Sequence, residues 1–147
     1  MSKPDAQLVA DLFEAWNAHD ADRIASLYAP DYEGVDIGEA TPRRGHAGIR
    51  DAFARYLHAF PDVCFALDEI VAQGNRVALV WTATGTHQGS FMNIPPTGRT
   101  VAVRGMSLLE VEDGKVTRDL SVWDVAGLLR AIGLLPDLYA NTGGSSM

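Results

Sequence analysis

The sequence is poor in cysteine and in basic residues, and both shortages restrict what the protein can be. Its one cysteine, Cys64, cannot form an internal disulfide, and we expect it to be a small buried hydrophobic residue in an alternating apolar segment. The 12 lysines and arginines stand against 19 aspartates and glutamates, and the resulting net charge of -7 disfavours nucleic acid and anionic membranes as partners. The four histidines lack the spacing of a metal site and no nucleotide-binding glycine loop is found, so we expect no metal and no other cofactor.

No apolar run has the length of a membrane span, and the first residues are polar rather than typical of a signal peptide. We therefore expect a soluble cytoplasmic protein. The chain has 147 residues, of which 47% are hydrophobic, and this is enough for one domain with a core of its own. We expect a single domain over residues 1–140 and a flexible tail over residues 141–147, which are composed like a linker.

Apolar side chains recur at helical spacing in three segments of the first 60 residues. We expect the first helix to end near His19, with Ser2 and Asp5 as a possible capping pair. The second should begin at Asp20 and stop at residues 29–30, because the residue before a proline is pushed out of the helical region. A short strand is then predicted at residues 31–36, followed by a loop at residues 37–45. The third helix is predicted at residues 45–60.

Four longer segments alternate like strands, and turn residues separate them. Asp113-Gly114 is typical of a tight hairpin turn, and Asp124 is placed to cap a last helix that ends at Gly133. The order predicts an α+β domain in which a curved antiparallel sheet wraps around the N-terminal helices and leaves a cone-shaped cavity. The four predicted strands are residues 63–73, 77–87, 101–111 and 116–123. The last helix is predicted at residues 125–132.

The turn and loop segments 84–89, 95–98, 113–115 and 123–133 resemble those of SnoaL-like polyketide cyclases, and the resemblance extends from about residue 8 to residue 135. These cyclases belong to the nuclear transport factor 2-like superfamily, together with ketosteroid isomerases and limonene epoxide hydrolases. The resemblance implies a cystatin-like fold with a mixed, cone-shaped sheet.

The resemblance also implies a ring closure by aldol chemistry without metal or cofactor. In the family, a pocket aspartate on the last long strand acts as acid/base with a histidine on the strand before it. Counted from the turn at residues 113–115, these positions fall on Ser121 and Ser107. A serine without a neighbouring base does not accept a proton near neutral pH, so the mechanism cannot be transferred as it stands.

Strand parity indicates which residues could replace the missing acid and base. If Ser107 and Ser121 face the cavity, then Val103, Asp119 and Trp123 do as well. Asp119 is the leading catalytic candidate, because desolvation in an apolar cone would raise the pKa of its carboxyl. The alternative is a position near the rim, where Asp119 would pair with an arginine or with water.

Asp36 is the second catalytic candidate, because it ends the short strand near the place where the resembling ketosteroid isomerases carry their base. Its alternative is a solvated carboxylate at the edge of a loop. His87 could donate to a substrate oxygen, or it could tie its ring to the backbone of the following loop. The further aromatic candidates for the cavity wall are Trp16, Tyr32 and Phe91.

These residues predict a cofactor-free enzyme that performs acid/base chemistry, either cyclisation, isomerisation or hydration, on an apolar oxygenated small molecule. A non-catalytic binding or accessory protein is the first alternative. An epoxide hydrolase, in which Asp36 and Asp119 would share a water, is the second. We also expect a homodimer, because Met106, Leu108 and Leu120 alternate out of phase with the cavity residues and would form an exposed apolar outer face.

Overall fold

The computed structural model describes residues 2–136 and confirms the α+β architecture. In chain order the elements are α1 (Lys3–Asn17), α2 (Ala21–Ser26), β1 (Tyr28–Asp36), β2 (Arg43–Arg44), α3 (Gly45–Ala59), β3 (Cys64–Gln73), β4 (Arg76–Thr86), β5 (Thr100–Glu112), β6 (Lys115–Trp123) and α4 (Val125–Ala131). The predicted tail at residues 141–147 lies outside the described residues.

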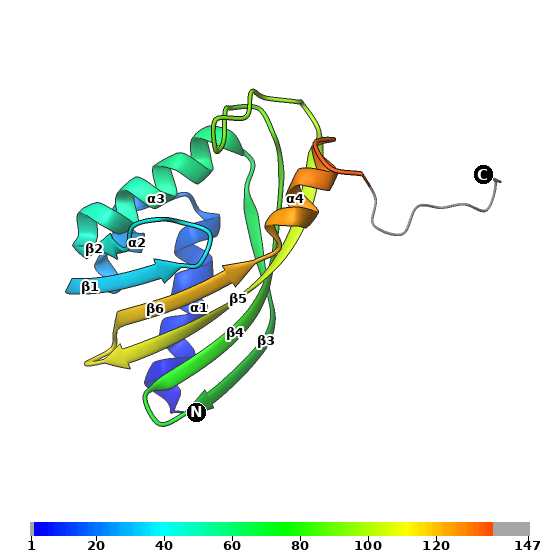
Figure 1. Cartoon of the computed structure of the whole chain (residues 1–147). Helices are drawn as coiled ribbons and strands as arrows, with labels where there is room; N and C mark the ends of the chain where they lie inside the picture. Colours follow the sequence, from blue (N-terminus) through cyan, green and yellow to red (C-terminus); the bar gives the residue numbers. More distant parts are fainter. Residues whose placement is uncertain (1, 137–147) are drawn as a thin grey trace.

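The six strands form one mixed sheet with the order β2-β1-β6-β5-β4-β3. Strands β3 to β6 form the expected antiparallel meander, whereas β1 runs parallel to β6 and antiparallel to β2. The sheet curves around the N-terminal helices, with α1 against β3 and α3 against β1, while α4 packs on β5 (Figure 1). The described helices include none that is long and apolar enough to cross a membrane.

Two apolar clusters hold the helices on the concave face of the sheet. The larger one joins α1, α2 and α3 to β4, β5 and β6, and the smaller one lies beneath α4. The fully buried side chains at their centres include Val9, Ile24, Ile49, Val77, Val116 and Leu128. Because the two clusters lie at opposite ends of the sheet, the space between them is where a cavity can form.

The local signals at the end of the chain are confirmed. Asp113 and Gly114 both have positive φ, 51° and 71°, as a two-residue hairpin turn of type I′ requires. The side chain of Asp124 accepts a hydrogen bond from the Gly127 amide at 2.8 Å and so caps α4. Gly133, with φ of 88°, follows the end of that helix.

Three expectations about the earlier part of the chain are wrong in detail. Helix α2 ends at Ser26 rather than at residues 29–30, because Tyr28 already pairs with Val116 of β6. Strand β1 begins at Tyr28 rather than at residue 31, so Pro30 lies inside it, where the pairing register shifts and a missing amide hydrogen is tolerated. The predicted loop at residues 37–45 contains β2, which pairs with β1.

Cys64 is exposed, contrary to the expected burial. Its neighbours Val63 and Phe65 point toward the interior, so Cys64 lies on the opposite, outer face of β3. Strand β3 is the last strand of the sheet, and nothing within residues 2–136 covers its outer face.

The outer face of the sheet carries the apolar residues that parity predicted. Leu120 of β6 pairs with Leu108 of β5 and with Val35 of β1, which places apolar side chains side by side on three strands. Leu120 and Met106 are 45% and 51% exposed. The apolar outer face is thus present in the single chain, and dimerisation through it stays a prediction.

Candidate functional site

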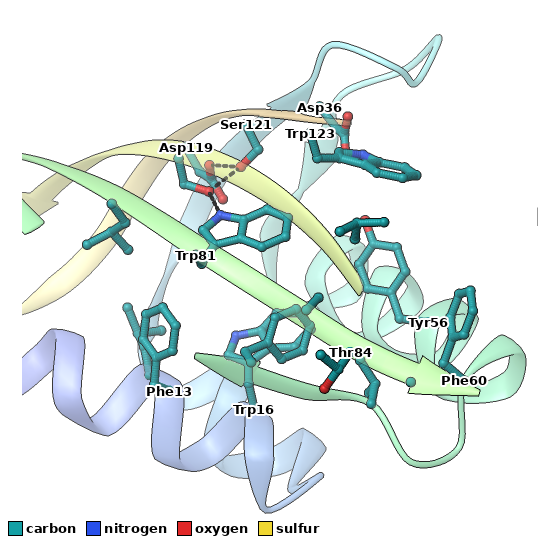
Figure 2. Close-up of a pocket in the computed structure, with 18 of the residues that line it drawn as sticks. Phe13, Trp16, Asp36, Tyr56, Phe60, Trp81, Thr84, Asp119, Ser121 and Trp123 are labelled. Carbon is teal, nitrogen blue, oxygen red and sulfur yellow. Dashed lines mark hydrogen bonds between the residues drawn. The ribbon is translucent and has the colours of Figure 1, made fainter. Parts of the chain in front are cut away.

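A cavity of about 160 Å³, partly open to solvent, lies between α1, α3 and the inner face of the sheet. It is smaller than the roughly 300–1,000 Å³ of pockets for drug-sized ligands, so it fits one or two rings, and a larger ligand would extend beyond it. Figure 2 shows Phe13 and Trp16 of α1 on one side and Trp81, Asp119 and Ser121 of the sheet on the other. The aromatic lining residues are Phe13, Trp16, Tyr28, Tyr56, Phe60, Phe65, Trp81, Phe91 and Trp123.

Apart from Gly105, which carries no side chain, the residues that strand parity assigned to the cavity all line it. They are Val103 and Ser107 of β5 and Asp119, Ser121 and Trp123 of β6. Trp16 and Phe91, chosen as aromatic wall candidates, line the cavity as well. One face of two neighbouring strands therefore brings the carboxyl group and both serines together.

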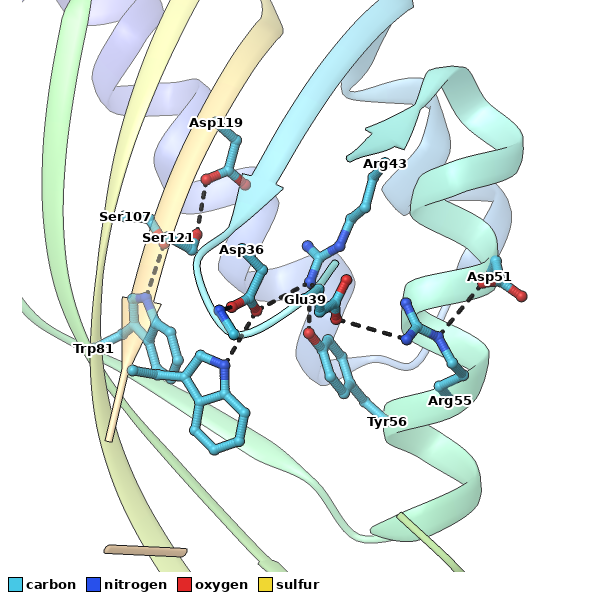
Figure 3. Close-up of polar contacts among 12 residues, drawn as sticks. Asp36, Glu39, Arg43, Asp51, Arg55, Tyr56, Trp81, Ser107, Asp119 and Ser121 are labelled. Atoms are coloured by element: carbon cyan, nitrogen blue, oxygen red, sulfur yellow. Dashed lines mark hydrogen bonds and ion pairs between the residues drawn. The ribbon is translucent and has the colours of Figure 1, made fainter. Parts of the chain in front are cut away.

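A chain of hydrogen bonds leads from an indole to the Asp119 carboxyl (Figure 3). Trp81 Nε1 donates to Ser107 Oγ at 3.0 Å, the hydroxyls of Ser107 and Ser121 are 2.7 Å apart, and Ser121 Oγ donates to Asp119 Oδ1 at 2.8 Å. An indole N–H can only donate. Because the Ser121 proton is used toward Asp119, Ser107 must donate to Ser121, and every bond of the chain points toward the carboxylate.

Glycines make room for the groups at both ends of this chain. Gly105 pairs with Trp81 across β4 and β5, and a Cβ at Gly105 would overlap the indole ring. Gly34 of β1 pairs with Asp119, and a Cβ there would overlap the Tyr32 hydroxyl, which lies 3.5 Å from Asp119 Oδ2. The two glycines allow the Trp81 and Tyr32 rings to lie across the inner face of the sheet.

Asp119 is half-buried, and burial raises the pKa of its carboxyl, against the lowering effects of the Ser121 hydrogen bond, the Arg43 charge and Tyr32. No basic group within residues 2–136 lies at ion-pair distance from it. Burial thus acts on the pKa in the expected upward direction, and among the described residues no arginine pairs with the carboxyl.

Asp36 also lines the cavity, but its environment differs from that of Asp119. It is only 4% exposed, so it is not a solvated carboxylate at the loop edge. Its Oδ1 accepts from the Gly38 amide at 3.0 Å, and its Oδ2 accepts from Trp123 Nε1 at 3.1 Å and from Arg43 Nη2 at 3.4 Å. These donors already occupy both oxygens, which suits a carboxylate that positions its neighbours.

Arg43, Tyr56 and Trp81 contribute to the site, and sequence reasoning did not identify them. Arg43 lies in the segment predicted as loop, and Tyr56 lies within the predicted third helix. Arg43 Nη2 donates to the Tyr56 hydroxyl, and both side chains line the cavity. The parity of β4 could have indicated Trp81, because it lies opposite Gly105 on the cavity face.

Neither His87 nor Tyr32 lines the cavity, which favours the loop-tying alternative for His87 over a catalytic one and corrects the expectation that Tyr32 forms part of the wall. His87 is fully buried, and its Nδ1 accepts from the Thr97 amide at 3.3 Å and lies 3.1 Å from the Thr97 hydroxyl. The ring thus ties down the loop between β4 and β5 instead of reaching a substrate. Tyr32 is 1% exposed, packs edge-on against Tyr28 and acts behind the cavity wall as a partner of Asp119. Residues 2–136 contain no group of three or more His, Cys, Asp or Glu side chains arranged to hold a metal ion.

Comparisons with known proteins agree with the geometry. The sequence model of the SnoaL-like polyketide cyclase family matches residues 6–132. The solved structure of AclR, a putative hydroxylase from Streptomyces galilaeus, is 33% identical over 95% of this chain and 90% of that chain, with a TM-score of 0.82. IdmH, a putative polyketide cyclase from Streptomyces antibioticus, is 30% identical over 90% of this chain and 99% of that chain, with a TM-score of 0.78. TsrD from Streptomyces laurentii is 26% identical over 92% and 99% of the two chains, with a TM-score of 0.82. No functionally curated protein matches the sequence.

Proposed function

Because the chain belongs to the SnoaL-like polyketide cyclase family, we propose that it is a cofactor-free enzyme that performs acid/base chemistry on an apolar, oxygenated small molecule. The observation that carries this proposal is the Asp119 carboxyl, which lines an aromatic cavity without an ion-pair partner among the described residues. A carboxyl with a raised pKa is a suitable general base and, once protonated, a suitable general acid. The step that we assign to Asp119 is removal of a proton from a carbon next to a carbonyl group.

Asp119 compensates for the serine at position 121. The resemblance to the family places an acid/base group at Ser121, and the Asp119 carboxyl reaches to within 2.8 Å of that hydroxyl. A carboxyl two residues earlier on the same face of β6 therefore lies one hydrogen bond from the family position. Asp119 would thus supply the acid/base group that position 121 lacks in this chain.

The serine hydroxyls can accept a hydrogen bond from the protonated carboxyl. When Asp119 has taken a proton, it can donate to Ser121, and Ser121 can then donate to Ser107. Trp81 cannot accept, so the proton of Ser107 becomes free to point into the cavity. The chain of hydrogen bonds reverses with each protonation of Asp119, and this property suits repeated proton transfer.

The cavity favours a substrate with one or two rings at the reacting end. Its wall is dominated by aromatic side chains, which pack well against flat apolar molecules. IdmH is described as a putative polyketide cyclase, and ring closure starts from the same proton removal as isomerisation. The proposal therefore concerns the step that these reactions share.

Two other functions are less consistent with the site. A purely binding role would be favoured by a cavity without polar groups, and here Asp36, Arg43 and Asp119 line it. An epoxide hydrolase needs carboxylates free to hold a water between them, whereas both oxygens of Asp36 already accept hydrogen bonds.

The test is the exchange of the acidic carbon-bound protons of 2-tetralone, a two-ring ketone, with deuterium from the solvent. We expect the wild-type protein to accelerate the exchange, measured by proton NMR, and Asp119→Asn to reduce the acceleration by about 10²–10⁴-fold. Asp31→Asn, which removes an exposed carboxylate from β1, is the matched control. Saturable binding of 2-tetralone without any acceleration would contradict the proposal and favour the binding protein.

A further inference from the structure

We propose that Arg43 and Tyr56 form the oxygen-binding site of the cavity. In this site they would hold the carbonyl or phenol oxygen of an aromatic substrate and stabilise the negative charge that develops there. The inference rests on the proposed function, since it names the partner group for the proton removal assigned to Asp119. It also defines the substrate class, which is a flat ring system that carries an oxygen at its inner end.

The contacts of the Arg43 guanidinium with Asp36, Glu39 and Tyr56 are concentrated on one of its nitrogens. Its side chain is 10% exposed, and Nη2 alone makes the contacts with Asp36 at 3.4 Å, with Glu39 at 3.5 Å and with the Tyr56 hydroxyl. Within residues 2–136, the buried Nε has no hydrogen-bond partner and Nη1 makes no hydrogen bond. Because Nη2 makes all of these contacts, a ligand oxygen at Nη1 would gain a charge-assisted hydrogen bond that the protein does not supply.

Tyr56 adds a second donor beside the guanidinium. Its oxygen accepts a hydrogen bond from Arg43, so the hydroxyl proton is free to donate to a third atom. Burial raises the pKa of Tyr56 to about 12, against the lowering effect of the Arg43 charge, so the hydroxyl keeps its proton at neutral pH. A hydroxyl polarised by a neighbouring positive charge is a strong donor to an oxygen that gains negative charge.

The surrounding ion pairs fix the guanidinium and determine which kind of oxygen it suits. Glu39 contacts both Arg43 and Arg55, and Arg55 in turn contacts Asp51 at 3.4 Å (Figure 3). Together with Asp36, two arginines alternate with three carboxylates, so the group has no excess positive charge. A neutral carbonyl or phenol, which becomes negative only during reaction, therefore fits better than a permanent anion.

The oxygen-binding site and the Asp119 carboxyl face one another across a single strand. Arg43 of β2 and Asp119 of β6 both pair with Gly34 of β1. Two strand spacings place their Cα atoms about 10 Å apart. The Tyr32 hydroxyl lies over Gly34, 3.5 Å from Asp119 Oδ2, and the Arg43 charge acts on the Asp119 carboxyl. A substrate carbonyl held at Arg43 and Tyr56 would thus present its neighbouring carbon toward Asp119.

Binding of 2-naphthol, compared with naphthalene, tests this inference by fluorescence titration. Both molecules have the same ring system, and only 2-naphthol carries an oxygen. We expect Tyr56→Phe and Arg43→Lys each to weaken 2-naphthol binding by about tenfold or more, because each removes a donor of a charge-assisted site. Naphthalene binding should stay unchanged in both variants, and Arg44→Lys, at an exposed arginine next in the chain, is the matched control.

An NMR measurement on the wild-type protein avoids any effect of substitution on folding. The side-chain N–H signals of Arg43 should shift more when 2-naphthol is added than when naphthalene is added, because only 2-naphthol supplies an oxygen to accept from them. Equal losses of affinity for both probes, or an Arg43 signal that ignores 2-naphthol, would overturn the inference. Neither result would touch the dependence of 2-tetralone exchange on Asp119, so the proposed function is tested separately.

Discussion

Replacement of Asp119 by asparagine should change how the stability of the protein depends on pH. Asparagine has nearly the same shape but cannot ionise, so the variant lacks the cost of holding a charge in the cavity. In the structure, burial has the largest effect on the pKa of this carboxyl and raises it. A short hydrogen bond from Ser121 and a longer one from Tyr32 offset this rise only in part.

The raised pKa of Asp119 determines whether the stability of the folded protein rises or falls with pH. Between the unfolded value of about 3.9 and the higher folded value, the folded protein binds more protons than the unfolded chain. The free energy of unfolding of the wild-type protein should therefore be highest below the unfolded pKa. It should fall as the pH rises between the two pKa values, and it should stay lower above the folded pKa. Each unit between the two pKa values corresponds to about 1.4 kcal/mol. Asp119→Asn should lack this loss.

The assay is urea unfolding of both proteins at several pH values between 4 and 8. Any constant effect of the substitution on hydrogen bonding cancels when the difference at pH 8 is compared with the difference at pH 4. Asp31→Asn, which removes an exposed negative charge from the same sheet, corrects for the change in net charge. A difference between Asp119→Asn and wild type that does not grow with pH would refute the account of a desolvated carboxyl.

Two further predictions concern the sheet. Gly105→Ala should displace the Trp81 ring, because a Cβ at this position overlaps the indole. The free energy of unfolding, measured in urea, should fall by about 1–3 kcal/mol. Unchanged stability and unchanged Trp81 fluorescence would contradict this. The outer sheet face should hold a homodimer, so that sedimentation shows a dimer for the wild type and a monomer for Leu120→Asp, whose residue is 45% exposed in the single chain. A wild-type monomer at micromolar concentration would argue against this interface.

The fold was predictable where local residues determine the backbone. Asp113-Gly114 and Asp124 identified a hairpin and a helix start, because turn geometry and capping depend on residues only a few positions apart. Strand parity then placed Asp119 on the cavity face, since alternation depends only on the register within β6. The end of α2 was misjudged, because pairing of Tyr28 with a distant strand overrides the local rule for the residue before a proline.

Arg43 and Tyr56 could not be found in the same way. Arg43 reaches the cavity through β2, a strand of two residues whose existence depends on pairing with β1. An arginine in a short irregular segment has the pattern of a solvated surface residue, and a tyrosine on the apolar side of a helix has the pattern of the core. Their contact depends on the packing of α3 beside β2, which no spacing in the sequence reveals.

The most direct test of the central claim compares two titrations of the same protein. The pKa of the Asp119 carboxyl is measured by carbon NMR, and the rate of 2-tetralone deuteration is measured as a function of pH. If Asp119 is the base, the rate should rise with pH and reach half of its plateau at the pKa found for that carboxyl, above the ordinary value of about 3.9. A rate profile with a different midpoint, or an Asp119 carboxyl with an ordinary or lowered pKa, would contradict the account.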